Sequence, residues 1–501
     1  MAAAAHRHWV KRPEIAEPAS LARICRFLAL TSFAITAAMA VPIVWSVLEA
    51  DGVTLHLAAS TFVGLAVSAS LAFYGQRARL SELSGKEAIL SVALSWVVAS
   101  AIVGLPYLLT GTTDNWLDAL FEGVSGFTTT GASILTDLEL IPRSVLMWRS
   151  FSQWIGGIGI IVLTLAVFPI SRAGMQLYKA EVSGPTHERL TPRIQETAAF
   201  LWKVYLALTT TQIFLLLIGG LDFFDASTLA FSTIATGGFS PYARNVGHFG
   251  SVYVTWVTAV FLFLAAANLS FYHACLARDR LAKLKKNVEL HFYVKVFLLF
   301  SVLLSCVLYA GGHAATLHEA LRTGFFHTVS MLSTCGFFVS DYNLWPAAAR
   351  FLLLVLMFVG GCSTSTSGGI TCIRVAVMVR HVRDEFYRLL HPRAIVPASY
   401  GDVALEARVV SACFAFFIAY MGIFTLGFIL LTLCGQDMTT AFSGAAATLG
   451  NVGPGFGMVG PSEGYAAQSA AVKCIYMVLM LCGRLEIFTL LLLFTRRFWR
   501  Y

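Results

Sequence analysis

Long runs of apolar residues alternate with short polar stretches along most of the chain. The runs lie at about 27–48, 55–74, 88–109, 146–168, 199–218, 253–275, 292–309, 409–433 and 471–494, with a further run from about 347. About 20 apolar residues in a helix are enough to cross a bilayer. Each run therefore predicts a transmembrane helix.

Shorter amphipathic stretches lie between these runs. From Trp116 to Val124 the apolar residues recur at helical spacing, and the chain then enters a polar turn at Thr129, Thr130 and Gly131. A helix of about a dozen residues cannot cross a hydrocarbon core of about 30 Å, so we expect it to dip into the membrane and return. Similar turns follow at Ala235, Thr236 and Gly237, at Thr334, Cys335 and Gly336, and at Thr448, Leu449 and Gly450.

The order of long run, short helix, polar turn and long run occurs four times. It predicts an all-α polytopic membrane protein of four membrane–pore-loop–membrane repeats with pseudo-fourfold symmetry, preceded by a two-helix hairpin. The expected units are a tail (1–26), the hairpin (27–86) and four pore repeats (87–193, 194–287, 288–400 and 401–501).

Composition and charge support this reading. Hydrophobic residues make up 57% of the 501 positions, which excludes a set of soluble domains. The net charge of +8 could indicate nucleic acid, but the basic residues cluster in short loops between apolar runs, where they set membrane orientation. We therefore expect cytoplasmic inter-repeat loops and termini, turns entering from outside, and no nucleic-acid partner. The ten cysteines lie mostly in apolar runs and are expected to pack as small hydrophobes.

The four turns have the chemistry of a cation filter. Non-helical backbone at membrane depth is tolerated only where it faces protein or a water-filled path. Converging carbonyls can replace the hydration shell of a monovalent cation, and the carboxyl ends of the short helices favour positive charge. A divalent-cation filter would need carboxylates. One such turn alone would be an ordinary glycine turn, but four at similar spacing predict ligands for a monovalent cation at Thr130, Gly131, Thr236, Gly237, Thr334, Cys335, Thr448 and Leu449.

A second break interrupts the apolar run that begins near 347. It consists of small and hydroxylated residues, namely Gly360, Gly361, Cys362, Ser363, Thr364, Ser365, Thr366, Ser367, Gly368 and Gly369. A polar, pliable segment below a filter predicts a gate, and a packing kink is the alternative. Arg484, inside the last run, is expected to act with the gate. A salt bridge to Glu486 or a snorkelling side chain is the alternative. Glu122 and His327 are expected to brace their loops.

The turn sequences resemble the filter signatures of the Trk/Ktr/HKT superfamily of potassium transporters, most nearly the bacterial TrkH type. The resemblance rests on Phe-Thr-Thr-Thr-Gly at 127–131, Ala-Thr-Gly-Gly-Phe at 235–239, Ser-Thr-Cys-Gly-Phe at 333–337 and Gly-Asn-Val-Gly-Pro-Gly at 450–455. It extends from about 88 to the carboxyl end, and the amino-terminal hairpin also fits. Ala235 and Leu449 depart from the threonines of the other turns.

This resemblance implies K⁺ uptake across the bacterial inner membrane, a homodimer, and a cytosolic Trk-A-type regulatory subunit with RCK domains. Nucleotide would act only through that subunit, and no covalent cofactor is expected. The stretch 360–369 resembles the intramembrane loop that obstructs the pore in TrkH-like proteins, which have an arginine matching Arg484. Relatives that favour Na⁺ have serine where this chain has Gly131.

Other functions remain open at this point. A Na⁺-permeable or cation-coupled member of the same superfamily would share these features. An intramembrane enzyme could use Cys362 or Ser363, but the adjoining spans offer no nearby histidine or lysine base. An organic-solute carrier would also use broken helices, but such carriers usually show two repeats. We therefore expect a transporter and not an enzyme.

Overall fold

The structure is a computed structural model that describes residues 18–80, 83–159, 194–268, 271–272, 275, 287–393, 399–400, 403–404, 407–485 and 487–500. The second half of the predicted span 146–168, the basic loops at 171–193 and 278–286, and Glu486 lie outside the described residues.

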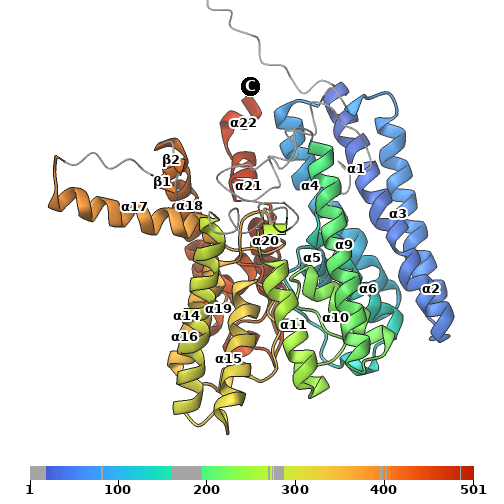
Figure 1. The fold of residues 1–501 in the computed structure, drawn as a ribbon. Coiled ribbons are helices and arrows are strands. Elements are labelled where there is room, and N and C mark those ends of the chain that lie inside the picture. Colours follow the sequence, from blue (N-terminus) through green and yellow to red (C-terminus); the bar gives the residue numbers. More distant parts are fainter. Residues whose placement is uncertain are drawn as a thin grey trace, which may run out of the picture.

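The described chain is a bundle of helices (Figure 1). The amino-terminal hairpin consists of α1 (Pro18–Ala38), α2 (Ala40–Glu49) and α3 (Thr54–Gly75). The first two repeats contain α4 (Gly85–Leu109), α5 (Trp116–Phe127) and α6 (Arg143–Gly157), then α9 (Ile194–Ile218), α10 (Phe223–Ile234) and α11 (Val252–Ala265). The hairpin flanks the bundle on one side (Figure 1).

The last two repeats follow the same order. They contain α14 (Val288–Ala310), α15 (Leu317–Leu332), α16 (Ala347–Val359) and α17 (Cys372–Leu390), then α18 (Ala407–Leu433), α19 (Met438–Leu449), α20 (Ala470–Arg484), α21 (Ile487–Leu493) and α22 (Arg496–Arg500). Short 3₁₀ turns lie at η2 (Leu138–Leu140), η3 (Asn245–Phe249), η4 (Tyr342–Leu344) and η5 (Gly457–Val459). The strands β1 (Ser399–Tyr400) and β2 (Val403–Ala404) form a small antiparallel pair. The helix α17 projects from the bundle on the side away from the hairpin (Figure 1).

Six of the described helices are long and apolar enough to cross a membrane, or up to seven if α20 and α21 count as one bent span. This confirms the prediction of an all-α polytopic membrane protein. Several spans differ from the sequence-based bounds. The first helix begins at Pro18, within the predicted tail, and α11 ends at Ala265, ten residues before the predicted end of its span. The last span divides where α20 ends at Arg484. At this break the Arg484 side chain donates to backbone carbonyls of Thr366 and Gly156.

The four short helices α5, α10, α15 and α19 are the elements that position the site. Each begins at a residue whose side chain accepts a hydrogen bond from the first helical turn, namely Asn115, Asp222, Thr316 and Asp437. Small residues let them pack closely on the long spans. A Cβ on Gly123 of α5 would lie within 3.0 Å of the backbone of α4, and a Cβ on Gly324 of α15 would meet Ser305 of α14 equally closely.

Candidate ion filter and gate

All four short helices end in the same hydrogen-bonded turn. After α5, the N–H of Thr129 donates to the carbonyl of Gly126 (3.1 Å) and the N–H of Thr130 to that of Ser125 (2.9 Å). This pair of bonds is the Schellman motif. The same pairs recur at Thr236 to Thr233 and Gly237 to Ser232, at Thr334 to Met331 and Cys335 to Ser330, and at Asn451 to Thr448 and Val452 to Ala447.

The left-handed residue of each turn is not a glycine. Thr129, Thr236, Thr334 and Asn451 have φ between 52° and 57°. Glycine is the usual residue at this place, and a threonine there is strained. The hydroxyl of Thr236 contacts that of Thr366 (3.3 Å), and the hydroxyl of Thr334 accepts a hydrogen bond from the N–H of Gly368 (2.8 Å). These side chains connect the turns to the stretch 360–369.

The glycine two residues farther on brings each turn against the next. Gly131, Gly238, Gly336 and Gly453 all have positive φ, between 75° and 96°. A Cβ on each would lie within 3.0 Å of the carbonyl oxygen of Gly237, Cys335, Val452 and Thr130, respectively. Repeat 1 thus contacts repeat 2, which contacts repeat 3, which contacts repeat 4, which contacts repeat 1. The four turns therefore close around a common axis, and we call them the filter turns (128–131, 235–238, 333–336 and 450–453).

This cycle corrects two of the sequence-based registers. Gly131 and Gly336 occupy equivalent positions, but the second partner is Gly238, one residue after Gly237. In the fourth turn Gly450 caps α19 with φ −78°, and the equivalent residue is Gly453. Thr448 and Leu449 are the last residues of α19, and the Thr448 hydroxyl donates to the carbonyl of Gly444 (2.6 Å) inside the helix. Asn451 explains the error, because asparagine adopts the left-handed conformation and takes the place of the expected threonine.

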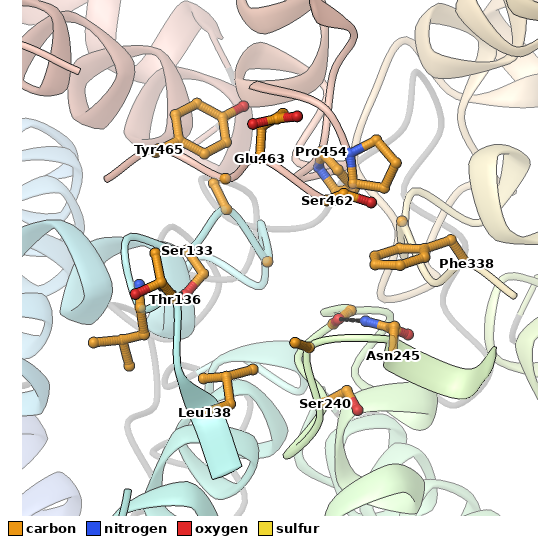
Figure 2. Close-up of a pocket in the computed structure, with 18 of the residues that line it drawn as sticks. Ser133, Thr136, Leu138, Ser240, Asn245, Phe338, Pro454, Ser462, Glu463 and Tyr465 are labelled. Carbon is orange, nitrogen blue, oxygen red and sulfur yellow. Dashed lines mark hydrogen bonds between the residues drawn. The ribbon is translucent and has the colours of Figure 1, made fainter. Parts of the chain in front are cut away.

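One side of the filter turns opens into a cavity of about 130 Å³ (Figure 2). We call this side the outer face because the sequence predicts that the turns enter from outside. All four repeats line it. In Figure 2 its labelled residues surround an open space, with Ser133, Thr136 and Leu138 from the first repeat, Ser240 and Asn245 from the second, Phe338 from the third, and Pro454, Ser462, Glu463 and Tyr465 from the fourth. Three filter glycines, Gly131, Gly238 and Gly336, also line this cavity. It is therefore a vestibule leading to the turns.

A buried ion pair braces the outer face. The Arg149 Nε donates to Glu122 Oε1 (2.7 Å), and its Nη1 donates to the carbonyl of Ser240 (2.8 Å). Glu122 also accepts from the Ser133 hydroxyl and from the N–H of Ile134. Because both charges are buried and hydrogen-bonded, their cost in the membrane is offset. As predicted for Glu122, the pair ties the first loop to the second. His327 packs edge-on against Tyr342 and Trp345, in the segment that follows the third filter turn.

The stretch 360–369 lies against the opposite, inner face and is called the inner loop. It begins where α16 ends and is closed at its base by the N–H of Ile370, which donates to Phe358, and that of Cys372, which donates to Gly361. Gly360 and Gly369 pack face to face there. The far part, including Thr366 and Gly368, contacts the second, third and fourth filter turns. The loop is therefore placed where it would block an axial path.

Arg484 joins this loop to the first repeat. Its Nη1 donates to the carbonyl of Thr366 (2.7 Å), and its Nη2 donates to the carbonyls of Gly156 and Gly157 (both 3.0 Å). Its guanidinium also lies 5.6 Å from the Trp96 ring centre. The side chain turns into the protein, which excludes the snorkelling alternative. Arg484 therefore lies at the inner face, between the inner loop and the first repeat.

The other end of the loop is held by Glu289 and Asn268, which sequence reasoning missed. The Glu289 carboxylate accepts from the N–H of Ser363 (2.6 Å) and from its hydroxyl (2.8 Å). Asn268 donates to both Glu289 and Ser363, and it accepts from Thr364 (3.2 Å). Ser365 and Ser367 share a hydrogen bond within the loop. The sequence held one signal for Glu289, because an acidic residue at the start of an apolar span indicates a buried polar contact.

No group of three or more His, Cys, Asp or Glu side chains among the described residues could hold a metal ion. The oxygens that the filter turns present to one another are neutral backbone and hydroxyl oxygens. Such oxygens suit a monovalent cation, whereas Ca²⁺ and Mg²⁺ sites are usually built with carboxylates.

The family model described as "TrkH: Cation transport protein" matches residues 56–501. The chain is 37% identical over 484 residues to the Trk system potassium uptake protein TrkH of Halomonas elongata, covering 96% of this chain and 100% of that one. It is 35% identical over 480 residues to the protein of the same name from Escherichia coli K12, covering 95% and 99%.

A solved structure shows the same fold. The crystal structure of the potassium transporter TrkH from Vibrio parahaemolyticus superposes with a TM-score of 0.86 at 34% identity, covering 96% of this chain and 99% of that one. The fold, the four turns and both sequence comparisons agree over nearly the whole length. The chain belongs to the TrkH family of cation transport proteins.

Proposed function

We propose that this protein takes up K⁺ across the bacterial inner membrane, using the four filter turns as its ion site. The observation that carries the proposal is the cycle of contacts from each filter glycine to a carbonyl of the next turn. Four neutral oxygens at equivalent positions, Thr130, Gly237, Cys335 and Val452, can take the place of water around a K⁺ ion. The relatives' names as potassium uptake proteins support the same ion.

The membrane potential can drive K⁺ uptake without a second substrate. An ion of one positive charge gains about 2.3 kcal/mol for every 100 mV of membrane potential that it crosses inward. The vestibule would supply the hydrated ion and the filter turns would strip its water. A coupled ion is compatible with the same geometry. The Na⁺-permeable alternative is disfavoured by glycine at all four equivalent positions, 131, 238, 336 and 453.

The inner loop is proposed as the gate. It contacts three filter turns directly and is held by Arg484 on one side and by Glu289 on the other. The guanidinium places a positive charge below the filter, which raises the barrier for a cation while the loop stays closed. Withdrawal of the loop would remove both the obstruction and the constraint on Arg484.

The assembly is proposed from family membership. A homodimer in the inner membrane, with both termini in the cytoplasm, would bind a cytosolic Trk-A-type RCK subunit, and nucleotide would act through that subunit. Ser363 is explained as an anchor of the loop, since its hydroxyl and its N–H both bond Glu289, and this favours a transporter over an enzyme.

Rubidium uptake by the purified protein in proteoliposomes, under an inside-negative potential and with or without the cytosolic partner, tests the proposal. We expect uptake that K⁺ suppresses and that excess Na⁺ suppresses much less. Equal suppression by both ions would contradict K⁺ selectivity. Absence of uptake with and without partner would contradict transport through these turns.

A further inference from the structure

The four filter turns differ at the residue before the filter glycine. Three of them have a side chain there, Thr130, Cys335 and Val452, but the second has Gly237. In each of those three turns the side chain reaches toward the preceding repeat. The Thr130 hydroxyl accepts from Asn451 (2.9 Å), the Cys335 sulfur approaches the carbonyl of Ser232 (3.9 Å), and Val452 packs in the cluster with Leu332 and Met357.

The missing side chain of the second turn is replaced by a group from the preceding repeat. Gln153 lies on α6 of repeat 1 and is fully buried. A Cβ built on Gly237 would have as its three nearest atoms the carbon, oxygen and nitrogen of the Gln153 carboxamide, all within 3.0 Å. The carboxamide thus occupies the volume that a residue like Thr130 would need for its own side chain.

The same carboxamide also holds the backbone on both sides of Gly238. Its Nε2 donates to the carbonyl of Gly237 (2.6 Å), and its Oε1 accepts from the N–H of Phe239 (3.1 Å). Gly238 has φ +81° and is the residue that contacts Cys335 in the next turn. A two-point hold across a glycine restricts the conformations that glycine would otherwise sample.

Gln153 acts as part of a continuous face of α6. Residues four apart on a helix lie on one face. On α6 this face carries Arg149, Gln153 and Gly157, and it lies along the second filter turn. Arg149 bonds the carbonyl of Ser240, Gln153 bonds Gly237 and Phe239, and Gly157 packs against Ala235. One helix of repeat 1 therefore runs along the whole filter turn of repeat 2.

We infer that Gln153 is a selectivity-determining positioning residue, whose carboxamide takes the place of the absent side chain at Gly237 and fixes the second turn of the filter. The inference rests on the proposed K⁺ function. Without the carboxamide, the Gly237 carbonyl and the flanking backbone are free to reorient, so this turn would adapt to smaller ions such as Na⁺. We expect gating to be unaffected, because the carboxamide of Gln153 bonds the second filter turn at Gly237 and Phe239 and not the inner loop.

The test measures the permeability ratio of Rb⁺ to Na⁺ in proteoliposomes for Gln153→Ala and Gln153→Met. Methionine fills a similar volume but has no donor or acceptor to replace the carboxamide. We expect both variants to lower the ratio by about fivefold, the change in an equilibrium that one ordinary hydrogen bond produces. Gln212→Ala is the matched control, since Gln212 is also fully buried but has no hydrogen-bond partner among the described residues.

A swap tests the replacement directly. Gly237→Thr alone should lose selective uptake, because its Cβ collides with Gln153. Gly237→Thr combined with Gln153→Ala should recover a ratio above that of Gln153→Ala alone, since the turn then resembles the first one. A wild-type ratio in both single Gln153 variants, or a double variant no better than Gly237→Thr, would overturn the inference. Absence of selective uptake by the unmodified protein would instead contradict the proposed function.

Discussion

The filter turns and the inner loop are both non-helical backbone inside the membrane, but different contacts hold them. The filter turns are buried almost throughout, and each glycine lies against a backbone carbonyl of the next turn. Much of the inner loop is only half-buried. Backbone hydrogen bonds and close glycine packing hold its base, and the rest is held largely by hydrogen bonds to the side chains of Thr334, Glu289 and Arg484. Water can replace such hydrogen bonds, but it cannot replace close backbone packing. The comparison indicates a rigid filter above a loop able to move.

The largest expected effect comes from Gly336→Ala, which disrupts the close packing of the filter turns. Its Cβ would collide with the carbonyl of Val452 and with Pro454, and its φ of +75° is strained for alanine. Overpacking of this kind typically costs about 1–3 kcal/mol. We expect loss of selective rubidium uptake and a lower thermal stability in detergent.

Gly312→Ala is the matched control, because Gly312 has φ +71° but open space around its Cβ. It shares the backbone strain without the collision. Similar losses of selectivity in both variants would show that conformation alone matters and would contradict the close packing of the turns.

Arg484→Ala should have the next largest effect. It should raise rubidium uptake, whereas Gly336→Ala should reduce selective uptake. It removes three hydrogen bonds to backbone carbonyls and a positive charge below the filter. We expect rubidium uptake to rise by about tenfold, since hydrogen bonds to charged groups are worth about 1.5–3 kcal/mol each and part of that holds the loop closed. Arg143→Ala should leave uptake unchanged, because Arg143 is partly exposed and pairs with Glu49 and Asp222, outside the inner loop. Unchanged or reduced uptake in a folded Arg484 variant would argue against this residue as part of the gate.

Glu289→Gln should raise uptake less, by about fivefold. The amide keeps the size of the side chain but weakens its bonds to Ser363, because charge-assisted hydrogen bonds are about twice as strong as neutral ones. Glu319→Gln controls for the loss of an acidic group in the first turn of a helix, since Glu319 holds that place in α15 and its carboxylate accepts from the N–H of Ala315, outside the loop. The ratio of Rb⁺ to Na⁺ should stay at the wild-type value, and a changed ratio would mean that the filter itself was disturbed.

Glu463→Gln should have the smallest effect. Glu463 is exposed and lines the vestibule, where its charge would concentrate cations (Figure 2). We expect uptake at low K⁺ and low ionic strength to fall by about twofold, and the difference to vanish near 1 M salt, where the screening length is about 3 Å. A difference that persists at high salt would point to a structural role for Glu463.

Sequence patterns predicted local features better than contacts between repeats. The lengths of the apolar runs and the helical spacing in the short stretches follow from neighbouring residues, and they indicated four re-entrant units. The register of the fourth turn was missed because Asn451, and not a threonine, holds the left-handed position. Gln153 and Glu289 were missed because their partners, Gly237 and Ser363, are more than 70 residues away in the chain. Only packing shows which polar side chain of a span meets which turn.

The most direct test of the account is anomalous X-ray diffraction from crystals of this protein grown in Rb⁺. The account predicts an anomalous peak on the axis between the carbonyl oxygens of Thr130, Gly237, Cys335 and Val452. A well-ordered structure with no peak among these oxygens, or with Rb⁺ bound only elsewhere, would contradict it.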